Sequence, residues 1–177
     1  METRILIAGF GGQGILFLGK YLAAIGMALD RQVSWLPSYG PEMRGGTAQC
    51  GVILADTAIG SPLVEEPDIL AAMNNPSFAA FEGAVKPGGS LYYDPAFVPE
   101  DARTRSDIAY LPVPAAQASE DESLKGLANM IMAGALLKSL PEVTADVIEA
   151  AMKKTVPERK KEMFDANMRA VALGYAF

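Results

Sequence analysis

The stretch that decides the fold is RILIAGFGGQG, residues 4–14. Its first half is a short apolar run rich in β-branched residues, which is typical of a buried strand. After residue 14, apolar residues recur at spacings of three and four as far as Leu29, which is typical of an amphipathic helix. The change of period predicts a strand, a tight glycine turn and a helix.

The glycines Gly9, Gly11 and Gly14 have the spacing of the G-x-G-x-x-G motif, in its expected strand–turn–helix context. Glycine allows a sharp turn, and the helix start exposes N–H groups that attract an anion. Two interpretations stay open: a phosphate-bearing ligand at the helix start, or a close-packed turn that binds nothing. Dinucleotide folds place an acidic residue at the end of the second strand. We expect that strand at residues 32–36, followed by Pro37 and Ser38, so NAD or FAD binding of the usual kind is not expected.

Composition limits the class of protein. The chain has 177 residues, half of them hydrophobic, which predicts a single domain over residues 1–177. The net charge of -6 argues against a nucleic-acid partner, which requires a basic face. One cysteine, Cys50, and no histidine exclude a Cys/His zinc site, a Cys-ligated iron–sulfur cluster and a histidine-based triad within the chain.

The sequence shows no clear targeting segment and no run of about 18 apolar residues that would span a membrane. A cytoplasmic protein without a membrane partner is therefore expected.

A second informative stretch is PSYGPEMRGGT, residues 37–47. Its three glycines and two prolines exclude a continuous helix or a central strand. It nevertheless carries Tyr39, Glu42, Met43 and Arg44, whereas a simple linker is usually small and polar, so a binding loop is predicted. Arg44 is suited to pairing with a carboxylate or phosphate of a ligand, or with Glu42 or another acid of its own fold.

The remaining pattern predicts an α/β fold: a Rossmann-like open twisted sheet, mostly parallel, with flanking helices and a helical C-terminal part. Strands are expected at residues 47–55, 68–73, 90–93 and 108–113, with residues 58–64 returning as a hairpin. Helices are expected at residues 77–85, 124–140, from a Thr144 cap through Lys154, and 158–175. The stripe Phe164, Met168, Val171 and Tyr175 of the last helix is assigned to the core.

Two asparagines are further candidates. Asn74 ends a strand at the carboxyl edge, where ligands bind in open α/β sheets. Asn129 lies in the buried helix, where an unpaired amide costs about 1–3 kcal/mol, so it needs a partner. That partner is either a backbone carbonyl or a loop or ligand at the strand ends. Since the loops after the first two strands emerge at one edge, the glycine turn, residues 39–47 and Asn74 should lie side by side.

No catalytic residue and no metal ligand is predicted in this chain. The candidate binding residues are Gly9, Gly11, Gly12, Gln13, Gly14, Tyr39, Glu42, Arg44, Gly45, Gly46, Thr47, Asn74 and Asn129.

Four segments, residues 7–14, 38–48, 72–74 and 128–130, closely resemble the gamma chain of 2-oxoacid:ferredoxin oxidoreductases, nearest to the 2-oxoglutarate or ketoacid type. The resemblance runs in order from residue 4 to about residue 140, and SYGPEMRGGT is its most specific part.

The resemblance implies an enzyme assembly that decarboxylates a 2-oxoacid on thiamine diphosphate, passes electrons through iron–sulfur clusters to ferredoxin and releases an acyl-coenzyme A. It implies alpha and beta partner chains, with a ferredoxin-like delta chain as an optional further partner. This chain would lie near the coenzyme A side, hold no cofactor alone and be inactive when isolated. The preferred oxoacid and a homodimer of the isolated chain are left open. The alternatives are a stand-alone anion- or nucleotide-binding module and a purely structural subunit.

Overall fold

The structure is a computed structural model that describes residues 1–39, 47–157 and 159–177. It contains one six-stranded sheet in the order β2-β3-β1-β4-β5-β6. The strands are β1 (Glu2–Phe10), β2 (Gln32–Tyr39), β3 (Thr47–Ala55), β4 (Ile69–Ala72), β5 (Ser90–Tyr93) and β6 (Ala109–Pro112). β1, β4, β5 and β6 run parallel, whereas β3 is antiparallel to both β1 and β2. The predicted mostly parallel α/β fold is confirmed.

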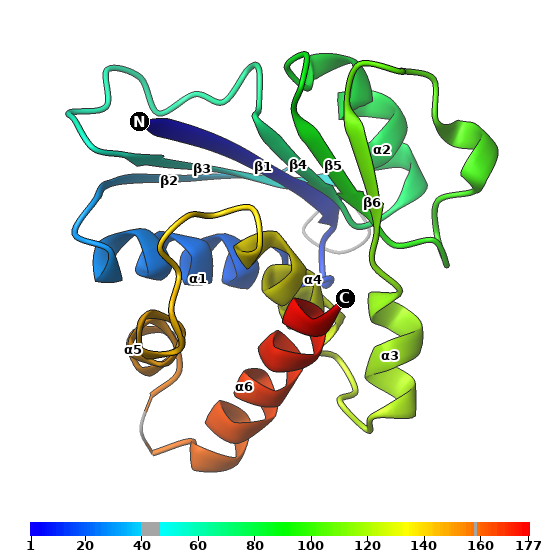
Figure 1. Cartoon of the computed structure of the whole chain (residues 1–177). Coiled ribbons are helices and arrows are strands. Elements are labelled where there is room, and N and C mark those ends of the chain that lie inside the picture. Colours follow the sequence, from blue (N-terminus) through cyan, green and yellow to red (C-terminus); the bar gives the residue numbers. More distant parts are fainter. Residues whose placement is uncertain (40–46, 158) are drawn as a thin grey trace.

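Helices cover the two faces of the sheet unequally (Figure 1). On one face lie α1 (Ile15–Ala28), α3 (Ala115–Asp121), α4 (Ala128–Leu137), α5 (Ala145–Thr155) and α6 (Lys161–Ala176), which enclose the larger hydrophobic core. On the other face, α2 (Asn75–Phe81) and the short 3-10 turn η1 (Glu82–Ala84) pack over the β4–β6 side, and η2 (Glu100–Ala102) follows β5. Helix α2 reaches as far as β1, and among the described residues no helix covers β3 and β2 on that face.

The core of the helical layer is a close crossing of α4 and α6. A Cβ on Gly174 would lie 1.8 Å from the carbonyl oxygen of Ile131, and one on Gly134 would lie 2.1 Å from that of Val171. Both helices therefore need glycine for their backbones to touch. Every residue of α4 from Asn129 to Leu137 is buried, as the apolar sequence predicted.

Strand β2 extends to Tyr39, three residues beyond the predicted end, because Pro37 is tolerated in it. The carbonyl of Ala8 accepts from the N–H of Met73 and so faces β4. Backbone N–H and C=O groups point to alternate sides along a strand, so those of Ile7 point toward β3 and those of its partner Cys50 point toward β1. The backbone of Pro37, which lies opposite Cys50, therefore points toward the free edge of the sheet. A proline lacks an N–H, and at this edge position no ladder bond is lost.

Other predictions on the elements were wrong in detail. Residues 58–64 form no strand; Val64 instead packs on the sheet, 3.1 Å from where a Cβ of Gly51 would lie. Helix α3 was not predicted. Of the stripe assigned to the core, Val171 is buried and Phe164 and Met168 pack against the core, whereas Tyr175 is 44% exposed. The described part of α6 begins at Lys161, and Glu158 lies outside the described residues.

In the described part of the chain, no helix has the length and apolar character needed to cross a membrane.

Candidate functional site

The glycine turn between β1 and α1 uses its glycines for different reasons. Gly12 and Gly14 have left-handed backbones, with φ of 101° and 73°, which side-chain-bearing residues rarely adopt. Gly9 is required by space, since a Cβ there would lie 2.7 Å from both Gln13 Oε1 and Ile15 Cδ1. Among the described residues, nothing lies within 4 Å of the corresponding position on Gly12, so this part of the structure leaves the turn open at that point.

The side chain of Gln13 fastens this turn to the end of β4. Its Oε1 accepts from the N–H of Phe10 at 2.7 Å and from Asn74 Nδ2 at 3.1 Å, and its Nε2 donates to the carbonyl of Met73 at 3.0 Å. Asn74 in turn caps α2, because its Oδ1 accepts from the N–H of Ser77 at 2.9 Å. The structure thus brings Gln13 and Asn74 together, and it uses both amides within the fold.

Asn129 packs against the turn from the helical side. Its Nδ2 donates to the carbonyl of Gly14 at 3.2 Å, so its partner is a backbone carbonyl, the first of the two alternatives that the sequence left open. The space where a Cβ of Gly14 would stand is filled by this amide, with Nδ2 2.3 Å away. Its Oδ1 is buried and has no hydrogen-bond partner among the described residues.

The start of α1 is electrostatically suited to an anion. No side chain caps the helix, and its ladder begins with the bond from the N–H of Leu18 to the carbonyl of Gly14. The N–H groups of Ile15, Leu16 and Phe17 precede that bond and carry the partial positive charge of the helix end. Residues 10–14 and 73–75 contain no charged side chain. The side chains of residues 10–14 and 73–75 therefore add no repulsion to an anionic group at the helix start.

The hairpin between β2 and β3 opens at the same edge. Thr47 pairs with Phe10 and so lies beside the glycine turn, and Tyr39 pairs with Ala48 at the same edge, one strand farther from β1. Thr47 and Asn74 therefore lie beside the turn as expected, whereas β3 separates Tyr39 from it. The predicted residues Glu42, Arg44, Gly45 and Gly46 lie outside the described residues.

Strand order gives a further reason to disfavour a dinucleotide. In a dinucleotide-binding unit the second strand of the βαβ motif lies beside the first. Here β3 separates β2 from β1, which places the end of β2 two strand spacings, about 10 Å, from β1.

A buried carboxylate at this edge was not recognised from the sequence. Asp94 follows β5 and is fully buried; it accepts from the N–H of Ala96 at 2.9 Å and from the N–H of Ala116 at 2.7 Å. It thereby fixes the start of α3. In the sequence, the Asp94-Pro95 pair that follows the strand indicates only the end of that strand, and it does not indicate a buried carboxylate.

The described residues contain no group of three His, Cys, Asp or Glu side chains that could hold a metal ion. Cys50 is buried within β3, as expected. Burial raises the pKa of its thiol to about 11, and a hydrogen bond with Trp35 offsets this only in part. It is therefore a protonated core residue at neutral pH and not a nucleophile.

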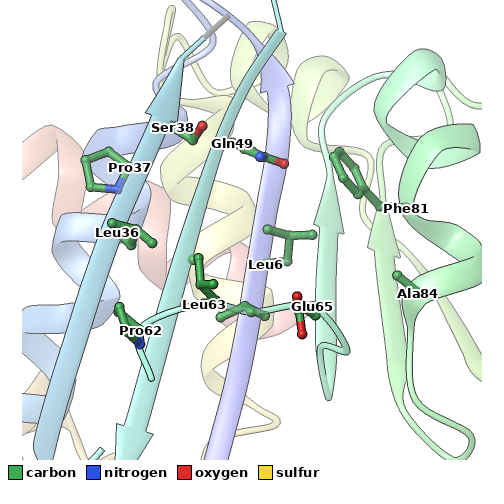
Figure 2. A pocket seen from close by; sticks show the side chains of 12 residues that line it. Leu6, Leu36, Pro37, Ser38, Gln49, Pro62, Leu63, Glu65, Phe81 and Ala84 are labelled. Atoms are coloured by element: carbon green, nitrogen blue, oxygen red, sulfur yellow. The ribbon is translucent and has the colours of Figure 1, made fainter. Parts of the chain in front are cut away.

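A groove runs between α2 and the exposed face of β3 and β2 to this edge (Figure 2). It consists of a hollow of about 540 Å³ and a second of about 280 Å³, which share Ser38, Gln49 and Phe81. The second hollow reaches Thr47 and Ser77 at the carboxyl edge. We call the two together the face groove.

The family model described as pyruvate ferredoxin/flavodoxin oxidoreductase matches residues 4–177. The 2-oxoglutarate synthase subunit KorC of Methanothermobacter marburgensis is 36% identical over 168 residues, which cover 92% of this chain and 90% of KorC. The ketoisovalerate oxidoreductase subunit VorA of the same organism is 36% identical over 98% of this chain. The chain spans only 36% of VorA's length.

Solved structures share the fold. The gamma subunit of keto/oxoacid ferredoxin oxidoreductase from Geobacter sulfurreducens superposes with a TM-score of 0.81 at 25% identity, covering 98% of this chain and 96% of that one. A 2-oxoglutarate:ferredoxin oxidoreductase chain from Magnetococcus marinus gives 0.84 at 23% identity, covering 99% of this chain and 30% of that one. With a family model matched from residue 4 to the last residue, the chain belongs to the pyruvate ferredoxin/flavodoxin oxidoreductase family.

Proposed function

We propose that the chain is the gamma-type subunit of a 2-oxoacid:ferredoxin oxidoreductase. The observation that carries this proposal is the match to KorC, which is 36% identical over 92% of this chain and 90% of that subunit. In the proposed reaction a 2-oxoacid and coenzyme A yield an acyl-coenzyme A and carbon dioxide. The two electrons released reduce two ferredoxins.

The redox chemistry is assigned to companion chains. An ordinary iron–sulfur cluster needs about four thiolates, and this chain has one cysteine, which is buried, and no histidine. Thiamine diphosphate and the clusters would therefore be held by alpha and beta chains, with a ferredoxin-like chain as a further partner. The contribution of this subunit is to bind and to position.

The carboxyl edge is the surface that we assign to the active centre of the assembly. The N–H groups at the start of α1 and the guanidinium of Arg44 would suit the phosphates of coenzyme A or an acidic group of a companion chain. Two features support this: the space in front of Gly12 is open, and the neighbouring residues carry no charge. Gln13, Asn74 and Asn129 would hold the turn in shape, since their amides bond within the fold.

The proposal is tested by co-expressing the tagged chain with the companion chains. We expect recovery of a complex that contains thiamine diphosphate and iron–sulfur clusters and reduces a viologen dye when oxoacid and coenzyme A are supplied. The isolated chain should reduce none and show no iron–sulfur absorbance. Dye reduction by the isolated chain, or its purification without any cofactor-bearing companion, contradicts the proposal.

The role of the edge is tested by Arg44→Ala in the assembled complex, with Arg169→Ala on the exposed side of α6 as control. Loss of a charge-assisted bond to a phosphate should raise the KM for coenzyme A about tenfold or more, with kcat little changed. Loss of assembly would assign Arg44 to a subunit contact instead. Unchanged kinetics in an intact complex would remove it from the site.

A further inference from the structure

The face groove is an apolar surface that the fold leaves uncovered. It lies over β3 and β2, which no helix of the described residues covers, with α2 along its β1 side, and the irregular segment between β3 and β4 crosses that part of the sheet (Figure 1). Leu36 on β2 is 37% exposed and Leu63 in that segment is 54% exposed, and both line the groove with Leu6 and Phe81. Large side chains exposed together in a concave surface indicate an interaction site.

We propose that the face groove is the docking surface for a companion polypeptide of the assembly, which inserts apolar side chains into the groove and places a lysine or arginine against Glu65 and Glu66. This inference rests on the proposed function and adds to it the surface by which the subunit is held.

In two relatives the same fold is one part of a longer polypeptide, because this chain matches 36% of VorA and 30% of the Magnetococcus chain. Under the proposed function, we assign the groove to a segment of a companion chain.

The rim of the groove defines the charge of the partner. Glu65 lines the end opposite Ser38 and Gln49 (Figure 2), and Glu66 follows it in the exposed segment. Neither carboxylate forms an ion pair within the described part of the chain, whereas nearby Asp68 is paired with Lys86 at 2.8 Å. Carboxylates left unpaired beside an apolar groove complement a basic partner.

Two competing modes of contact are disfavoured. A second copy of this chain would bring the same acidic rim and the same net charge of -6 to the interface, which like-charge repulsion opposes. Addition of a strand along β2 is obstructed by Pro37, whose position on the free edge offers no N–H to a pairing strand. The open face of the sheet is therefore the favoured surface.

The test uses co-expression of the chain with its companion chains and measures their recovery and dissociation constant. Leu63→Asp puts a charge into the groove, and Met163→Asp is its control, because Met163 is similarly exposed, at 42%, but lies on α6 on the other side of the sheet. Leu63→Asp should weaken the complex at least about tenfold, with the Tm of the isolated chain close to that of wild type. Met163→Asp should leave assembly unchanged.

A second variant tests the charge separately. The double change Glu65→Lys and Glu66→Lys should also weaken assembly about tenfold, most strongly at low ionic strength. Assembly of both groove variants with wild-type affinity overturns this inference alone. A wild-type chain that recovers no companion overturns the proposed function and this inference with it. A third outcome would also overturn this inference: the isolated wild-type chain is a dimer, Leu63→Asp converts it to a monomer, and assembly with the companion chains is unchanged. The groove would then be the contact between two copies of this chain.

Discussion

The two edges of the parallel part of the sheet are held by different chemistry. At the carboxyl ends of β1 and β4, neutral amides and glycines fix the turn, with Gln13 at the centre of the hydrogen bonds. At the amino ends of β5 and β6, charged groups fix the neighbouring loops. Glu82 is buried and accepts from the N–H of Thr104 at 2.8 Å, from its hydroxyl at 2.6 Å, and from the hydroxyl of Tyr110.

Arg105 extends the charged network at the amino edge. Its Nη1 donates to the carbonyls of Glu82 at 3.0 Å and Val85 at 2.6 Å, and its Nη2 pairs with Asp107 at 2.7 Å. These charges have their partners within the fold and serve stability. The glycine edge is different: the side chains that fasten its turn are neutral, and among the described residues no side chain caps the N–H groups at the start of α1. The amino edge thus uses its charges for stability, whereas binding is the role that we propose for the glycine edge.

The largest expected effect is at the glycine edge, for Gly14→Ala. A Cβ there clashes with the buried amide of Asn129, and alanine must also adopt the left-handed backbone of this position. We therefore expect a loss of about 3 kcal/mol in the free energy of unfolding. Gly12→Ala is the control, because it carries the backbone strain without the clash and should lose about 1–2 kcal/mol. Urea denaturation measures both. Equal losses would show that Asn129 does not brace the turn.

The next effect is at the charged edge, for Glu82→Gln, with an expected loss of about 2 kcal/mol near pH 7. Burial raises the pKa of Glu82, but the hydrogen bonds from Thr104 and Tyr110 and the charge of Arg105 outweigh it and hold the pKa below its ordinary value. A carboxyl group whose pKa is lower in the folded state stabilises above its unfolded pKa of about 4.3, and this stabilisation is lost as the pH falls through the folded pKa.

The difference in Tm between wild type and Glu82→Gln should therefore shrink on acidification from about pH 7 to about pH 3. Glu66→Gln, at an exposed position, should show little difference at either pH. A difference in Tm that stays constant with pH would show that the charge of Glu82 does not hold this edge.

A smaller effect is expected for Gln13→Met, which keeps the length of the side chain and removes its polar atoms. The bonds to Phe10, Asn74 and Met73 are lost, at a cost of about 1–2 kcal/mol, because Phe10 is partly open to water. Since no charge is removed, the loss should be the same at about pH 4 and about pH 7. Thermal denaturation at the two pH values compares the loss for Gln13→Met directly with that for Glu82→Gln. A pH-dependent loss for Gln13→Met would contradict the view that neutral groups hold the glycine edge.

The smallest effect is expected for Lys86→Met at the amino edge. Its ion pair with Asp68 joins side chains that are 38% and 32% exposed, and solvent screening leaves such pairs worth about 0.5 kcal/mol. The loss should disappear in about 1 M salt. A loss as large as that of Glu82→Gln would mean that exposed charges also hold this edge.

The sequence predicts the parts of the fold that depend on local pattern. The first strand, the turn and α1 follow from one change of period, and β3 and β5 have the predicted bounds. Thr144 caps α5 as expected, since its hydroxyl accepts from the N–H of Val147. In each case the deciding residues are neighbours along the chain.

The parts that the sequence did not predict depend on distant residues. Helix α3 begins where Asp94, 22 residues earlier, accepts from its first turn. Pro37 belongs to a strand only because β2 is at the edge of the sheet. At the candidate site, the sequence pattern indicated Gln13 and Asn129 but not their contacts. Gln13 fastens the turn to β4, and Asn129 packs against Gly14. Whether the edge binds a ligand stays a prediction.

The contact between Asn129 and Gly14 has a consequence for how the protein is made. Asn129 comes 115 residues after its partner, and synthesis proceeds from the N-terminus. All six strands leave the ribosome before α4 does, so the glycine turn is unsupported on its helical side until that helix docks. A nascent chain that ends before Asn129 lacks this support. Support of the glycine turn and docking of α4 are thus one event, and under the proposed function a companion chain that recognises the supported edge would select chains extended beyond α4.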